Sequence, residues 1–192
     1  MRIPLILLWT VLFLALACSG PERSPRPYGY HRIALPQKAY QEFDAPGYPY
    51  RFEYPVYGKI VPDTSRQSGA YWVDLRFPEY NGAVHISYKA IDQNLTAYTE
   101  DARDMAYKHA VRADAIQEQL IRLPRHNVYG TFYEIGGDAA SALQFYITDS
   151  SRHFLRGALY FRAQADRDSL GPVIRFFRQD IYHLIETTAW KN

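Results

Sequence analysis

The chain has one cysteine, Cys18, so it cannot form an internal disulfide or hold a metal ion between paired thiolates. Its longest hydrophobic run, residues 5–17, is apolar apart from Thr10 and is shorter than the roughly 20 residues that a membrane-spanning helix needs. A net charge of +2 is too small to indicate a nucleic-acid partner. The sequence also lacks a glycine-rich loop between a strand and a helix, and no two histidines stand at metal-ligand spacing with a third ligand nearby. We therefore expect no bound nucleotide, metal ion or other cofactor.

The first residues have the pattern of an export signal. Arg2 gives a positive start, the apolar run follows, and the small residues Ala15 and Ala17 suit cleavage before Cys18. Residues 14–18 resemble the lipobox of bacterial lipoproteins, although a lipobox usually has leucine in the place that Ala15 holds here. The resemblance implies that residues 1–17 are removed as a signal peptide and that Cys18 carries diacylglycerol and a further acyl chain such as palmitate. The alternative is ordinary cleavage after Ala17, which leaves a free thiol at Cys18.

Two further regions follow the signal peptide. Residues 18–29 contain three prolines and are typical of an extended tether behind the lipidated cysteine. The whole chain is 47% hydrophobic and 22% charged, which is the composition of a globular protein. Residues 30–192 are therefore expected to form a single domain that is large enough to bury its own core.

Apolar and polar residues alternate in several segments of this domain, which is the period of a half-buried strand. The alternation predicts strands at residues 50–56, 71–77, 84–88, 128–135, 143–147 and 155–161. Residues 116–123 are also assigned to a strand, although their polar residues equally suit a helix, and residues 30–49 are expected to be irregular. Asn81 and Gly82 form a turn signal, so the strands on either side of them are expected to pair as a hairpin.

Two segments have the spacing of an amphipathic helix. Apolar residues from Leu95 onward recur every three or four positions as far as His109, with Asn94 as the expected N-cap. The second helix closes the chain, with Ser169 as its expected cap and Pro172 in its first turn. Its buried stripe is predicted to consist of Ile174, Phe177, Ile181, Leu184 and Ile185.

The order of these elements predicts the fold class. We expect an α+β domain in which a mostly antiparallel sheet of about six strands packs with two amphipathic helices. This order is similar to that of the Mog1/PsbP-like sandwich. The similarity concerns element order alone and implies no function.

One short stretch contains the residue types of a serine hydrolase, namely Asp149, Ser150, Ser151 and His153. Members of a catalytic triad come from separate elements that converge in space, and no nucleophile-elbow motif is present. Asp and Ser are also common in turns for conformational reasons. We interpret the stretch as a turn and expect no enzymatic activity.

A second candidate site is a basic and aromatic face. Arg156, Tyr160 and Arg162 fall on one side of a predicted strand by its two-residue period. This side is a candidate partner-binding face. The alternative is a solvated surface on which arginine stems cover tyrosine rings.

Several runs of the sequence resemble one known family. The most specific are residues 52–55 (Phe-Glu-Tyr-Pro), 144–150, 153–161 and 180–187. They resemble the gliding motility lipoprotein GldD family over nearly the whole chain, including the lipid-bearing cysteine.

The resemblance implies a role in gliding motility and in the linked type IX secretion machinery of the cell envelope. The expected partners are other components of that machinery and, through the lipid anchor, either membrane of the envelope, with the domain facing the periplasm. The family supplies no catalytic residue or cofactor. The alternatives that stay open are a hydrolase-like envelope enzyme and a carrier of a glycan or lipid.

Overall fold

The computed structural model describes residues 34–65, 68–108, 113–137, 139–162 and 167–191. The predicted signal peptide, Cys18, the tether and His109 lie outside the described residues. The described helices and strands belong to one compact unit, Arg32–Asn192.

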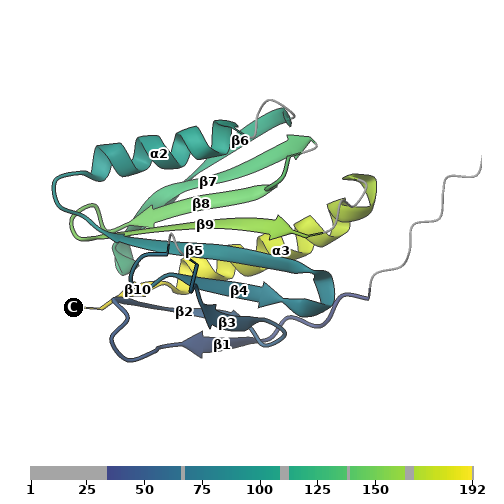
Figure 1. The fold of residues 1–192 in the computed structure, drawn as a ribbon, viewed down its shortest axis with the longest axis horizontal. Helices are drawn as coiled ribbons and strands as arrows, with labels where there is room; N and C mark the ends of the chain where they lie inside the picture. Colours follow the sequence, from purple (N-terminus) through teal and green to yellow (C-terminus); the bar gives the residue numbers. More distant parts are fainter. Residues whose placement is uncertain (1–33, 66–67, 109–112, 138, 163–166, 192) are drawn as a thin grey trace, which may run out of the picture. The chain divides into compact units, whose positions relative to one another are not determined.

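Seven strands form the main sheet in the order β3-β4-β5-β9-β8-β7-β6, and every neighbouring pair is antiparallel. The strands are β3 (Lys59–Pro62), β4 (Val73–Phe77), β5 (Gly82–Ala90), β6 (Ala113–Leu123), β7 (Val128–Gly137), β8 (Leu143–Thr148) and β9 (His153–Phe161). Helix α2 (Leu95–Lys108) connects β5 to β6, and helix α3 (Arg167–Thr187) follows β9. Figure 1 shows that β5 and β9 run along the middle of this sheet.

A second, smaller sheet has the order β1-β2-β10. Its strands are β1 (Tyr40–Phe43), β2 (Tyr50–Pro55) and the two-residue β10 (Ala189–Trp190). Both pairs are antiparallel, so the last strand of the chain is fixed beside one of the first. Helix α3 packs closely against β2 and also contacts β8, which connects the small sheet to the main sheet through one shared core.

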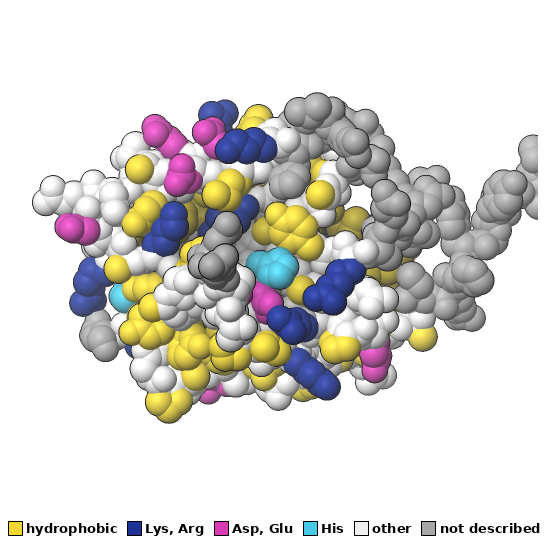
Figure 2. All heavy atoms as spheres, in the orientation of Figure 1, with side chains coloured by type: hydrophobic (Ala, Val, Ile, Leu, Met, Phe, Trp, Pro, Cys, Tyr) yellow, Lys and Arg dark blue, Asp and Glu magenta, His cyan; other side chains and the backbone are white. Residues whose placement is uncertain are grey.

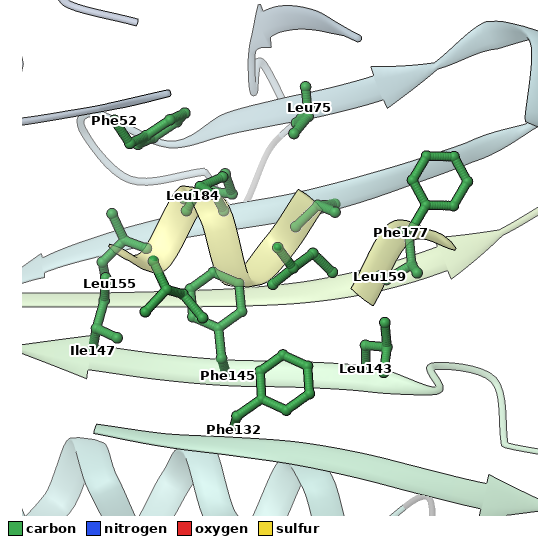
Figure 3. Close-up of a cluster of buried hydrophobic side chains, with 14 of the residues drawn as sticks. Phe52, Leu75, Phe132, Leu143, Phe145, Ile147, Leu155, Leu159, Phe177 and Leu184 are labelled. Atoms are coloured by element: carbon green, nitrogen blue, oxygen red, sulfur yellow. The ribbon is translucent and has the colours of Figure 1, made fainter. Parts of the chain in front are cut away.

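The apolar stripe of α3 forms the centre of this core. Phe177, Ile181 and Leu184 are almost completely buried against side chains from both sheets. Figure 3 shows Phe177 and Leu184 among strand residues that include Phe52, Phe145 and Leu159. A Cβ added at Gly157 would lie 2.2 Å from the ring of Phe145, so only glycine lets that ring lie across β9.

Helix α2 covers the opposite face of the main sheet. Phe132 of β7 belongs to the α3 core, whereas Tyr133 and Ile135 pack with Ala106 of α2. Successive residues of a strand point to opposite faces, so the two helices lie on different sides. Residues of β8 and β9 contact α2, whereas the α2-side surface of β4 and β5 extends past the helix.

A buried ionic network ties the segment before β1 to α3. The Asp180 carboxylate of α3 accepts hydrogen bonds from Lys38 Nζ at 2.7 Å, Tyr40 Oη at 3.1 Å and Tyr57 Oη at 2.6 Å. The ammonium of Lys38 also donates to the carbonyl oxygen of Phe176 at 2.8 Å. Burial, together with the neighbouring Asp180 carboxylate, raises the pKa of Tyr40 to about 12 and that of Tyr57 further.

The structure confirms the predicted fold class, with two helices and a mostly antiparallel sheet. It also confirms the predicted hairpin, because β4 pairs with β5, and it assigns residues 116–123 to strand β6. Three short strands were not predicted, and one of them, β1, lies within the supposedly irregular residues 30–49.

Of the two predicted helix caps, Asn94 has the predicted position and Ser169 does not. Asn94 lies directly before α2, and its carbonyl oxygen accepts the backbone N–H of Tyr98 at 3.2 Å. Its side-chain oxygen instead accepts a hydrogen bond from the backbone N–H of Asp92, and its amide donates to Tyr98 Oη. Helix α3 begins at Arg167, before Ser169, so Pro172 lies inside the helix rather than in its first turn.

Candidate functional site

Two of the three residues of the predicted partner-binding face lie together on β9. Arg156 and Tyr160 are four positions apart in the strand and therefore point to the same face, the one that α2 partly covers. Arg162 lies just beyond the end of β9, is exposed, and donates its backbone N–H to the carbonyl oxygen of Asn81 at 2.8 Å. The structure thus places Arg162 at the edge of this face, next to the β4–β5 connection.

Strand register brings further polar side chains to Arg156 and Tyr160. Ala158 pairs directly with His85 of β5 on one side and with Gln144 of β8 on the other. Directly opposed residues of antiparallel strands share a face, so these side chains surround the small, buried Ala158. We call His85, Gln144, Arg156 and Tyr160 the polar cluster.

Arg156 is held within this cluster by neutral partners. Its Nη2 donates to Gln144 Oε1 at 2.7 Å, and its guanidinium is also hydrogen-bonded to Tyr160. Burial lowers the pKa of Arg156, although Tyr160 partly opposes the shift. Among the described residues, no carboxylate is bonded to this guanidinium.

His85 is oriented by a buried carboxylate. Asp74 of β4 is 5% exposed, and its Oδ1 lies 2.6 Å from His85 Nδ1. The other carboxylate oxygen accepts a hydrogen bond from Arg76 Nη2 at 2.8 Å. Because Asp74 engages Nδ1, the second ring nitrogen of His85, Nε2, is left for contacts with solvent or a ligand.

A pocket of about 330 Å³ adjoins the polar cluster, between α2 and strands β4, β5 and β9. Its apolar walls come from Trp72, Tyr98, Met105 and Phe154, and its polar lining includes His85, Ser87 and Arg156. Figure 2 shows one face of the molecule, on which charged and histidine side chains lie among apolar ones. We call the polar cluster, together with this pocket, the α2-side face.

Three residues of this site, Asp74, His85 and Gln144, were not predicted from the sequence. A signal for two of them was present, because the predicted strands at residues 71–77 and 84–88 alternate and place Asp74 and His85 on the polar side of one hairpin. No such signal existed for Gln144, since its role depends on β8 pairing with β9.

The hydrolase-like stretch forms a turn, as interpreted. Asp149 Oδ1 accepts the backbone N–H groups of Ser151, Arg152 and His153 at 2.8–3.0 Å, and Oδ2 accepts the hydroxyl of Ser151. Burial alone would raise the pKa of Asp149, but these hydrogen bonds outweigh it and hold the pKa at about 2. The carboxylate is therefore occupied by its own turn.

His153 is likewise not arranged as a catalytic base. Its Nδ1 lies 2.9 Å from Tyr88 Oη, its Nε2 is buried without a hydrogen-bond partner in the described part of the chain, and its ring stacks on Trp190. Burial lowers its pKa. Neither ring nitrogen is bonded to Asp149 or Ser150, so these residue types are adjacent in sequence without forming a triad.

The described residues contain no helix long and apolar enough to cross a membrane. Within the same part of the chain, no three His, Cys, Asp or Glu side chains are grouped so that they could hold a metal ion.

Fold and site together define a small α+β domain with one partly open, polar and aromatic sheet face. The family model of the gliding motility lipoprotein GldD matches residues 20–190, and the chain belongs to this family. Membership in a lipoprotein family places it at a membrane of the cell envelope with a role related to gliding motility.

Among solved structures, the chain is similar to the cyanobacterial PsbP of Synechocystis sp. PCC 6803. The TM-score is 0.47 at 14% identity, over 89% of this chain and 99% of the other. A search of curated proteins found no match.

Proposed function

We propose that this lipoprotein supports gliding motility and type IX protein secretion by binding other components of that envelope machinery, without catalysing a reaction. In this proposal the signal peptide is removed, a lipid on Cys18 holds the protein at the membrane, and the domain faces the periplasm. The α2-side face is the binding surface.

The observation that carries the proposal is the chemistry of that face. Tyrosine and arginine are enriched where proteins bind one another, and Tyr160, Arg156 and Arg162 lie on or beside this face. The side chain of His85 on the same face is 54% exposed and therefore accessible to a partner. The use of Asp149 by its own turn removes the residue arrangement that favoured a hydrolase, which supports binding over catalysis.

The test replaces the native gene with a variant that carries Tyr160→Ala and Arg162→Glu. The matched control is Arg125→Glu, which changes an exposed arginine of the 3₁₀ turn Pro124–His126, outside the pocket lining. At equal protein levels, we expect the double variant to lose type IX secretion and colony spreading and the control to retain both. Removing a hot-spot side chain from an interface weakens the free energy of binding by about 2 kcal/mol, which corresponds to a roughly thirtyfold higher Kd.

Two results would contradict different parts of the proposal. Normal secretion in a deletion strain would remove the proposed function itself. Normal secretion in the double variant, combined with failure of the deletion strain, would leave the function and remove only the assignment of the α2-side face.

A further inference from the structure

We propose that the pocket beside α2 binds a ligand that joins one carboxylate to an apolar body. Arg156 receives the carboxylate, and Trp72, Tyr98 and Phe154 contact the body. This inference goes beyond the proposed function and does not depend on it, because it is argued from the pocket and Arg156 alone.

The first reason is the state of Arg156. A guanidinium offers five N–H donors in a planar fork that matches a carboxylate, and buried charges are normally paired with an opposite charge. Arg156 is half-buried, yet its partners are an amide oxygen and a phenol. In the described part of the chain, the guanidinium lines the pocket without a carboxylate to neutralise it.

The second reason is an unused donor next to it. Gln144 is 1% exposed, and its Nε2 has no hydrogen-bond partner among the described residues. Gln144 Oε1 accepts a hydrogen bond from Arg156. If the amide were rotated by half a turn, its NH₂ group would face the N–H of Arg156, and two donors would then be in contact. A buried donor without a partner is costly. Gln144 is bonded to the lining residue Arg156 without lining the pocket itself, so its free donor adds to the shortage of acceptors around Arg156.

Charge balance selects the type of anion. Lys89 Nζ already lies 4.0 Å from Asp101, and Asp74 is paired with Arg76 and His85. The carboxylates of Asp63, Asp74 and Asp101 also line the pocket and would repel a doubly charged anion such as phosphate. Of the two cationic side chains in the described lining, Lys89 has a carboxylate within 4.0 Å and Arg156 has none, so Arg156 is the group that a single carboxylate fits.

The apolar walls are held in place before any ligand binds. Trp72 Nε1 donates to the carbonyl oxygen of Tyr88 at 2.8 Å, and Tyr98 Oη accepts from Asn94 Nδ2 at 3.0 Å. A volume of about 330 Å³ lies at the small end of ligand pockets. It suits either a small free carboxylic acid or the last residue of a peptide with its terminal carboxylate.

The experiment is a calorimetric titration of the full protein in detergent. The probes are hydrocinnamate, the peptide acetyl-Ala-Ala-Phe with a free carboxylate, the amide of each, and inorganic phosphate. We expect the carboxylates to bind at about 1 mM or tighter, with each amide at least about tenfold weaker and phosphate not bound. A peptide that binds about tenfold tighter than hydrocinnamate identifies a chain terminus as the source, whereas equal affinity identifies a small acid.

Variants separate binding from folding. Arg156→Gln should abolish carboxylate binding, and Arg156→Lys should weaken it about tenfold, because an ammonium lacks the fork. Arg125→Gln removes the same charge from an exposed turn and should bind like wild type. Thermal unfolding should show Arg156→Gln as stable as wild type or more so, since a poorly compensated charge has been removed.

Three results would overturn the inference. They are equal binding of an acid and its amide, wild-type binding by Arg156→Gln, and binding of none of the carboxylates. If Arg156→Gln does not fold, Arg156→Lys decides in its place, and wild-type affinity in that variant counts against the site.

Discussion

At the scale of single residues, Asp149 shows how a carboxylate with a catalytic appearance serves the backbone. It accepts the N–H groups of Ser151, Arg152 and His153 at the start of β9, and its pKa lies at about 2, below the ordinary value of 3.8. A carboxylate with a lowered folded-state pKa stabilises the fold above its unfolded pKa, and this stabilisation is lost as pH falls toward the folded-state value. The contribution of Asp149 to the free energy of unfolding should therefore be lost as the pH falls from about 4 to about 2.

Two substitutions test this role by urea unfolding. Asp149→Ala leaves the N–H groups without their acceptor and should cost about 1–3 kcal/mol near neutral pH. Asp149→Asn keeps one acceptor oxygen but cannot titrate, so its loss of stability between pH 4 and pH 2 should be smaller than that of the wild type. An equal acid dependence in the wild type and Asp149→Asn would show that the carboxylate does not act in this way.

Residue-scale prediction from the sequence succeeded where the cause was local. Asp149, Ser150 and Ser151 form the expected turn because an aspartate bonds to N–H groups that follow it within a few residues. The Asp74–His85 pair and the orphaned amide of Gln144 depend on which strands lie side by side. No local pattern carries that information.

At the scale of elements, α3 is fixed by polar as well as apolar contacts. Its Asp180 is almost completely buried and is compensated by Lys38 and two tyrosine hydroxyls. Removing one partner of a buried ion pair leaves an uncompensated charge, so Asp180→Ala should lower the free energy of unfolding by about 3 kcal/mol.

The control for Asp180→Ala is the exposed pair of Arg51 and Glu42 on the small sheet. Both side chains are about half exposed, so Glu42→Ala should change stability by less than about 1 kcal/mol. Urea unfolding of both variants measures the difference. Similar losses in the two variants would contradict the anchoring role of Asp180.

Long strands and helices were predictable from the sequence, and short strands were not. The long strands and both helices follow from their hydrophobic periods. Strands β1, β3 and β10 have two to four residues each, too few for a period to show, and exist because a partner strand lies beside them. The start of α3 was misplaced because Pro172 is typical of a first turn but lies inside this helix.

At the scale of the whole molecule, α3 packs between a seven-stranded sheet and a three-stranded sheet, and α2 covers only part of the other face. Element order predicted one sheet with two helices. The division into two sheets was not predictable, because β2 has the same alternation as the strands of the main sheet and only its pairing with β1 and β10 separates it. The exposed remainder of the α2 side is where both proposals place their ligands.

The proposed function requires that this domain be held at a membrane by Cys18. The intact mass of the protein purified from native membranes tests this most directly. A chain that begins at Cys18 and carries the mass of diacylglycerol plus a further acyl group is the predicted result. A chain that keeps residues 1–17, or one that begins at Cys18 with a free thiol, would contradict it.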